Sequence, residues 1–285
     1  MRSKGIIRPL AVLLAIASSA LIAGSALAQG DVTKETDFRK IKPPSAHGTV
    51  IMNRSTASSA EVKPVVFPHW AHRDKYSCKA CHTDIGFKLK SNTTGVTQAD
   101  IEAGKYCGEC HNGKAAFAVA ECNRCHSYGI EVKENRKFDD AVKGLPADHF
   151  GNKVDWVKAL NEKKIKAGPA PGGKDGLESL DLDVIIPVTK FVPHPPDVKF
   201  PHKPHTEQMD CATCHTAIFK QQKGGNPEMN MMKIMAGQYC GVCHTRVAFP
   251  LDDCFRCHSQ PAPKAVELER EVKDDKAKDK EKEKK

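Results

Sequence analysis

The sequence is short of the large side chains from which protein cores are normally built. Phe, Trp and Tyr make up 6% of its 285 residues, and only two residues are tryptophan. Apolar residues reach 40%, a share that includes a run near the N-terminus. A chain of this composition buries little core from side chains alone, which excludes two ordinary globular domains unless something else supplies apolar surface.

Long apolar runs are absent beyond Leu10 to Leu27, so the sequence predicts no integral membrane segment, which would need ~20 such residues. Arg2, Lys4 and Arg8 precede that run and Ala26-Leu27-Ala28 ends it, the arrangement of a cleaved secretory signal peptide at 1–28. No cysteine follows the predicted cleavage site, which argues against a lipid anchor. We therefore expect an exported, periplasmic protein, with association with the outer membrane or cell surface left open.

No cysteine stands outside one repeated pattern, C-x-x-C-H. The pattern occurs six times and uses all 12 cysteines. It is the attachment site for a c-type haem, in which the two thiols add to the vinyl groups of one porphyrin and the histidine binds the iron. A single copy would fit a zinc ribbon, a dithiol or a disulfide about as well, but histidine is only 13 of 285 residues, which makes six chance copies negligible.

The sequence thus predicts six covalently attached c-type haems, whose faces would supply the missing apolar surface. The predicted haem-binding cysteines are Cys78, Cys81, Cys107, Cys110, Cys122, Cys125, Cys211, Cys214, Cys240, Cys243, Cys254 and Cys257. The predicted proximal iron ligands are His82, His111, His126, His215, His244 and His258.

The formal charge is +9, and removal of the signal peptide lowers it to +6. A basic balance often indicates nucleic acid or a membrane surface as partner. Here the propionates of six haems offset the positive charge, so no nucleic-acid partner is predicted.

An internal repeat divides the chain. Phe67-Pro68-His69 recurs 133 positions later as Phe200-Pro201-His202, and Tyr106-Cys107-Gly108 recurs as Tyr239-Cys240-Gly241. The repeat predicts two tandem triheme domains at 61–130 and 194–262. The other predicted parts are an extended polar arm at 29–60, a connecting segment at 131–193 and a charged tail at 263–285.

Local patterns in the connecting segment predict two elements. Asp155 to Leu160 has the pattern of a short amphipathic helix, and Val184 to Ile186 that of a short strand. The prolines and glycines of 168–176 predict a linker between them.

Seven histidines lie outside the haem motifs, and four of these form H-x-x-H pairs. The pairs are His69/His72 and His202/His205, each beginning nine residues before the first cysteine of its domain. Residues three apart share one face of a helical turn, so each pair can ligate two neighbouring haems. A role as solvent-exposed histidines is the alternative, which the identical offset in both repeats disfavours.

These residues resemble the c7-type triheme cytochromes of the broader cytochrome c3 family. The resemblance rests on Phe-Pro-His-x-x-His, Gly-x-Tyr-Cys-Gly-x-Cys-His and the other Cys-x-x-Cys-His motifs, over about 65–127 and 198–259. It implies small, mainly α domains with much irregular structure, organised around covalent haems, and small electron carriers as the functional class. It also implies that His69 and His202 ligate the first haem of each domain, and His72 and His205 the second.

The third haem departs from the family pattern, because Ala103 and Ala236 stand where the family has a histidine before the second haem motif. In the second domain Met231 and Met235 lie close by, and related modules use methionine on this iron; His194 is the rival. A methionine ligand would raise the potential of that haem.

The first domain has no methionine between His69 and His126. Either His149 or His47 therefore reaches back to its third haem, or that iron is open.

Three functions compete. A multihaem carrier would pass electrons between redox proteins outside the cytoplasm, in respiratory or extracellular electron transfer; its partners would be cytochromes, quinol-oxidising complexes or an outer-membrane conduit. A structural subunit would pack into a cytochrome conduit or filament. A reductase of a small oxyanion or a metal ion would need an open iron. The number of available ligands favours the carrier, so we expect no enzyme activity.

Overall fold

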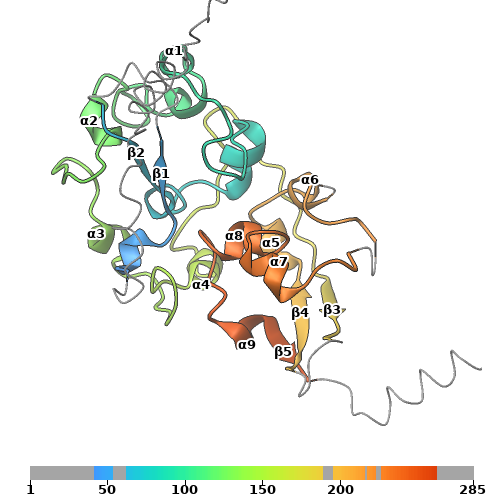
Figure 1. Ribbon diagram of the computed structural model, residues 1–285. Coiled ribbons are helices and arrows are strands. Elements are labelled where there is room, and N and C mark those ends of the chain that lie inside the picture. The colour runs from blue at the N-terminus through green and yellow to red at the C-terminus, as the bar shows by residue number, and fades with distance from the viewer. Residues whose placement is uncertain (1–41, 54–61, 189–194, 216, 223–225, 262–285) are drawn as a thin grey trace, which may run out of the picture. The chain divides into compact units, whose positions relative to one another are not determined.

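The computed structural model describes residues 42–53, 62–188, 195–215, 217–222 and 226–261 (Figure 1). The predicted signal peptide, His194, most of the predicted arm and the charged tail lie outside these residues. No helix within the described ranges is both long and apolar enough to cross a membrane.

Helices in the described residues are single turns or little more. The longest, α4 (Trp156–Asn161), has six residues. Helices this short are marginal in isolation, so contacts outside the helix must hold them. In the first half of the chain they are α1 (Gln98–Glu102), α2 (Cys122–Cys125) and α3 (Phe138–Val142), with short helical turns η2 (Pro44–Ala46), η4 (His69–Ala71), η5 (Ala80–Asp84) and η6 (Tyr106–Glu109). In the second half they are α5 (Lys203–Thr206), α6 (Cys211–Cys214), α7 (Met231–Met235), α8 (Gly241–His244) and α9 (Cys254–Cys257).

Side-chain caps explain where several helices begin. The Thr97 hydroxyl accepts from the Asp100 amide at the start of α1, and the Asp100 carboxylate accepts in return from the Thr97 amide. The Asp155 carboxylate accepts from the Lys158 amide at the start of α4, which confirms the helix predicted from Asp155 to Leu160. Asn230 caps α7.

A two-stranded antiparallel sheet lies in the first repeat. Strand β1 (Thr49–Met52) pairs with β2 (Val65–Pro68), with Met52 opposite Val65 (Figure 1). The described part of the predicted extended arm, 29–60, thus includes strand β1, which pairs with β2. Three consecutive apolar residues at 50–52 pair with a strand of the first repeat, a long-range match that composition does not reveal.

A three-stranded antiparallel sheet lies in the second repeat, in the order β3 (Asp183–Ile186), β4 (Asp197–Pro201) and β5 (His258–Gln260) (Figure 1). Strand β3 confirms the strand predicted at Val184 to Ile186. It falls within the predicted connecting segment but pairs with the second repeat, with Ile186 opposite Val198.

The side-chain core of the described residues is thin. The buried apolar residues there are Trp70, Ala80, Ala141, Val154, Ala159, Ile165 and Ala170, and no large side chain among the described residues is fully buried. This agrees with the sparse aromatic composition. The small, largely irregular fold with short helices is the fold class predicted from the sequence.

The two repeats agree in close detail. A Cβ on Gly108 would lie 2.0 Å from the carbonyl oxygen of Ile101, and one on Gly241 would lie 1.8 Å from that of Ile234. Only glycine allows the helix before the second haem motif to approach this closely.

Candidate haem-binding site

The cysteine pairs lie mostly on single helical turns. Cys122 and Cys125 begin and end α2, and Cys254 and Cys257 begin and end α9. Residues three apart share one side of a helical turn, so both thiols of a pair can reach one porphyrin. No disulfide joins any of the twelve cysteines. Burial raises the pKa of Cys81 to about 12, which keeps that thiol protonated and unlike a catalytic thiolate.

The six motif histidines share one hydrogen-bond arrangement. In each, Nδ1 lies 2.6–3.2 Å from a backbone carbonyl oxygen. A metal-binding histidine commonly donates its other ring N–H to such an acceptor, which fixes the tautomer and the ring orientation. The arrangement leaves Nε2 to bind iron. The acceptors are Phe87 for His82, Phe117 for His111, Lys63 for His126, Phe219 for His215, Phe249 for His244 and Pro196 for His258.

The four H-x-x-H histidines follow the same rule. Nδ1 of His69 lies 2.8 Å from the Gly48 carbonyl oxygen, and Nδ1 of His202 lies 3.0 Å from that of Leu182. His72 and His205 use the carbonyl oxygens of Pro68 and Pro201 respectively, at 3.0 and 2.8 Å. All ten imidazoles therefore direct the same nitrogen to the backbone and keep Nε2 available.

Three ring pairs have the spacing of axial ligands. The ring centroids are 6.5 Å apart for His69 and His82, 6.3 Å for His72 and His111, and 6.2 Å for His205 and His244. A metal–imidazole bond of ~2 Å on each side, plus about 1 Å from nitrogen to ring centre, sets two axial rings about 6 Å apart. These residues fit an iron between each pair.

The paired rings are also neutral. Burial lowers the pKa of His69 to about 4 and that of His244 to about 4. It also lowers the pKa values of His72, His111 and His205. An uncharged imidazole has the lone pair that iron requires.

Known proteins provide the decisive comparison. The family model described as cytochrome c7 and related cytochrome c matches residues 65–127 and 198–259, one match for each repeat. The two repeats are cytochrome c7-type domains. The chain is a multihaem c-type cytochrome that functions in electron transfer.

Solved structures and curated proteins were compared as well. The C-terminal hexaheme fragment of GSU1996 is 28% identical, covering 76% of this chain and 99% of that one, with a TM-score of 0.24. The dodecaheme cytochrome c GSU1996 is 25% identical, covering 74% of this chain and 73% of that one, also with a TM-score of 0.24. No curated protein matches the chain.

The fourth pair expected in the c7-type domains is His202 with His215. Both rings make their Nδ1 hydrogen bonds, at 3.0 Å and 3.2 Å. Among the described residues, the other three histidine pairs have ring centroids 6.2–6.5 Å apart, whereas His202 and His215 form no such ring pair.

The remaining histidine candidates for the first c7-type domain lie next to residues of the second repeat. His47 uses Nε2 itself, 2.7 Å from the carbonyl oxygen of Ala248, so that nitrogen is engaged. His149 is exposed, next to Asp148, which hydrogen-bonds Arg256. Both histidines therefore lie beside the second repeat, and His194 is outside the described residues.

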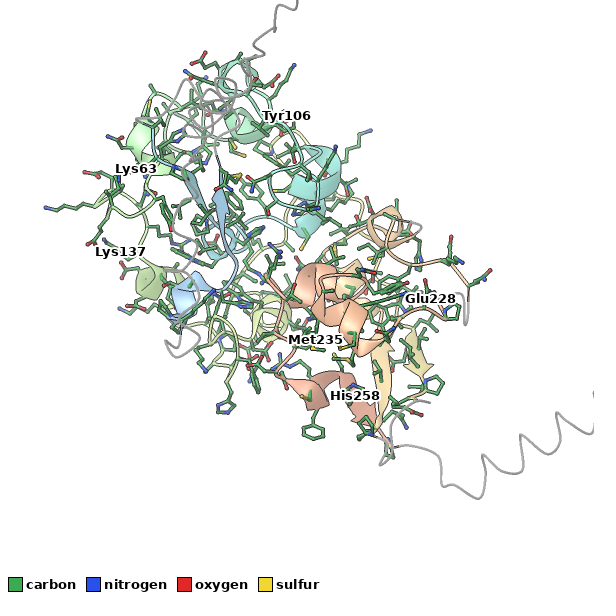
Figure 2. The ribbon with its side chains drawn as sticks, in the orientation of Figure 1. Lys63, Tyr106, Lys137, Glu228, Met235 and His258 are labelled. Atoms are coloured by element: carbon green, nitrogen blue, oxygen red, sulfur yellow. The ribbon has the colours of Figure 1, made fainter. Side chains whose placement is uncertain are left out.

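In the second c7-type domain, the predicted methionines lie on α7, and Figure 2 labels Met235 there. Met235 is 54% exposed, whereas Met231 is half-buried. In the first c7-type domain the corresponding helix, α1, carries Gln98 and Glu102 at these two positions.

The aromatic residues around the ligands were not predicted. Phe67 contacts both His69 and His72, with centroids 4.9 and 4.5 Å away, and Phe200 contacts His202 and His205 at 4.9 and 4.6 Å. A signal for others exists in the sequence. Four of the six haem motifs have a phenylalanine four to six residues after the histidine, and its carbonyl oxygen is the acceptor for that histidine.

Proposed function

We propose that the chain is an exported carrier with six covalent haems, passing electrons between redox proteins outside the cytoplasm. Suitable partners are other cytochromes, a quinol-oxidising complex or an outer-membrane conduit. The predicted signal peptide at 1–28 supports export to the periplasm, where association with the outer membrane or cell surface would place it near a conduit. Six complete motifs, with no cysteine used in a disulfide, support the haem number.

The observation that carries the proposal is the common orientation of the ten histidines. Each holds Nδ1 on a backbone carbonyl oxygen, and three pairs of rings face one another at 6.2–6.5 Å. Axial positions filled from both sides leave an iron no place for a substrate. That arrangement favours a carrier over a reductase.

We assign axial ligands on this basis. His69 with His82 would hold the first haem of the first domain, and His72 with His111 the second. In the second domain His205 would pair with His244, and His202 with His215.

For the third haem of the second domain, opposite His258, we assign Met231, because it is less exposed than Met235. His194 remains its rival.

Each haem, when bound, supplies a one-electron Fe(III)/Fe(II) couple. The chain's own residues determine how that couple behaves. Carbonyl acceptors fix each imidazole in one tautomer and orientation, which limits reorganisation when the charge changes. The half-buried Phe67 and Phe200 each pack against two candidate ligands, linking the first and second sites of each domain.

Contacts between the first motifs of the two domains support a continuous path. The Lys79 amide donates to the Gln208 carbonyl oxygen at 2.9 Å, and the hydroxyls of Thr83 and Thr213 lie 3.1 Å apart. These residues adjoin or fall within the motifs that begin at Cys78 and Cys211. The first haem sites of the two domains are therefore neighbours in the chain's fold.

Protein-film voltammetry of the holoprotein tests the carrier proposal. We expect reversible one-electron waves totalling six electrons per chain, unchanged when nitrite or a soluble ferric chelate is added. A catalytic current with either compound would favour the reductase instead. Fewer than six electrons, with a matching mass deficit, would contradict the haem number.

A further inference from the structure

The third haem of the first domain needs a second ligand that α1 does not provide. Gln98 and Glu102 stand where the second domain has Met231 and Met235. The Gln98 side-chain amide donates to the Glu102 carboxylate at 2.7 Å, so these two side chains bind each other. The other candidate histidines, His47 and His149, lie beside the second repeat.

The sheets show which residues flank the third haem motif. In the second domain, Val198 of β4 lies between Ile186 of β3 and His258 of β5. Residues directly opposite one another on antiparallel strands project from the same face. The side chains of Ile186 and His258 therefore rise from one face, on either side of Val198. Figure 2 labels His258 at this edge of the sheet.

The first domain shares part of this arrangement, although its sheet has only β1 and β2 and His126 follows α2 without lying on a strand. The His126 ring bonds the Lys63 carbonyl oxygen at 2.6 Å, as His258 bonds that of Pro196 at 2.7 Å. Val65 takes the place of Val198, and its partner on β1 is Met52. Met52 thus occupies the position of Ile186.

The spacing suits a ligand pair. Neighbouring strands are about 4.8 Å apart, so the backbones of Ile186 and His258 are separated by about 10 Å across Val198. From the equivalence of the repeats, we expect a similar separation between Met52 and His126. A flexible thioether and an imidazole can meet one iron across that distance. Met52 is half-buried, on a strand held by pairing with β2.

We propose that Met52 is the second axial ligand of the third haem in the first domain, which rests on the six-haem function proposed above. Each domain then contributes one thioether from a different element, Met52 from β1 and Met231 from α7. The sulfur donates a lone pair to the iron and no proton moves. Because a thioether stabilises Fe(II) relative to imidazole, the third haem of each domain has a higher potential than its histidine-ligated neighbours.

The test is NMR of the fully reduced holoprotein labelled with methyl-¹³C methionine. A methyl group bound at iron lies over the porphyrin ring, and the ring current shifts its resonance strongly upfield. We expect two such resonances in the natural sequence and one in Met52→Leu. The matched control is Ile51→Leu, the next residue on the same strand and on its opposite face, which should keep both.

Two more variants guard against a folding artefact. Met52→His should lose the same resonance, remain low-spin and lower the potential of one haem. Met52→Leu combined with Gln98→Met should recover a second resonance, because the thioether then comes from α1 as it does from α7. Haem number by mass spectrometry is measured on every variant.

The outcomes separate the two proposals. A natural protein with six haems but one shifted resonance, or a Met52→Leu variant that keeps both, overturns the Met52 assignment and leaves the carrier intact. A high-spin iron in the natural protein also overturns it, since that iron would be open. Fewer than six haems in the natural protein would instead count against the proposed function.

Discussion

The imidazole rings of His69 and His82 lie 14° from parallel, with their centroids 6.5 Å apart. One ring comes from the H-x-x-H pair and the other from the first haem motif. Gly48 and Phe87 accept their Nδ1 hydrogen bonds at 2.8 and 2.9 Å. Backbone atoms from separate segments therefore hold Nδ1 of both rings and leave both Nε2 atoms available, at a ring spacing that suits a six-coordinate iron.

Loss of one H-x-x-H histidine should open one iron. We expect His205→Ala to keep six haems but convert one from low-spin to high-spin, because His244 then has no partner ring at 6.2 Å. The reduced variant should bind one equivalent of carbon monoxide in an optical titration. His149→Ala, which changes an exposed histidine, is the control and should resemble the unaltered protein. A fully low-spin His205→Ala would remove His205 from the ligand set.

Gly241, where α8 packs against α7, should be required for stability. A Cβ on Gly241 would lie 1.8 Å from the carbonyl oxygen of Ile234, so Gly241→Ala must displace backbone. Overpacking of this kind costs about 1–3 kcal/mol, and we expect the melting temperature of the holoprotein to fall accordingly. Gly176→Ala is the matched control, because nothing lies within 4 Å of its added Cβ. Equal melting temperatures for the two variants would show that α7 can shift without loss of stability.

The ion pair between Asp148 and Arg256 should contribute pH-dependent stability. Burial raises the pKa of Asp148, but hydrogen bonds from Arg256 and from the Phe150 amide outweigh it and leave that pKa below its ordinary value. Its contribution is therefore complete above the ordinary pKa of aspartate in the unfolded chain. It is lost as pH falls through the lowered pKa of the folded state.

Asp148→Asn should reduce the free energy of unfolding at neutral pH by about 0.2–1 kcal/mol, the range for an ion pair that solvent partly screens. The difference should shrink in acid, where Asp148 itself is protonated. Chemical denaturation at several pH values measures this, with the exposed Asp175→Asn as control. A difference that stays constant into acid would show that the carboxylate charge plays no part.

The thin core predicts dependence on haem. No large side chain among the described residues is fully buried, so the polypeptide alone has little apolar surface to remove from water. Protein made without haem attachment should lose most far-UV circular dichroism and show no cooperative melting transition. A folded apo-protein with a sharp transition would mean that the side chains suffice.

The sequence was most informative where function depends on residues close together in the chain. Haem attachment needs two thiols and a histidine in five consecutive residues, so all six motifs can be read directly. The helix at Trp156–Asn161 was also predictable, because Asp155 is a local cap.

Long-range contacts were not predictable in the same way. The carbonyl acceptors Gly48 and Leu182 lie about 20 positions from the histidines they orient, and nothing in a carbonyl group identifies it in a sequence. Met52 was overlooked for the same reason. Its position opposite Val65 depends on strand register, which the composition of the predicted extended arm does not reveal.

Electron paramagnetic resonance of the oxidised holoprotein, with spins counted per chain, tests the central claim most directly. The account predicts six low-spin ferric centres, each with two axial ligands from the chain, and no high-spin signal. A high-spin centre would contradict a carrier in which the chain supplies both axial ligands of every iron. So would a total below six low-spin centres in a protein whose mass shows full haem attachment.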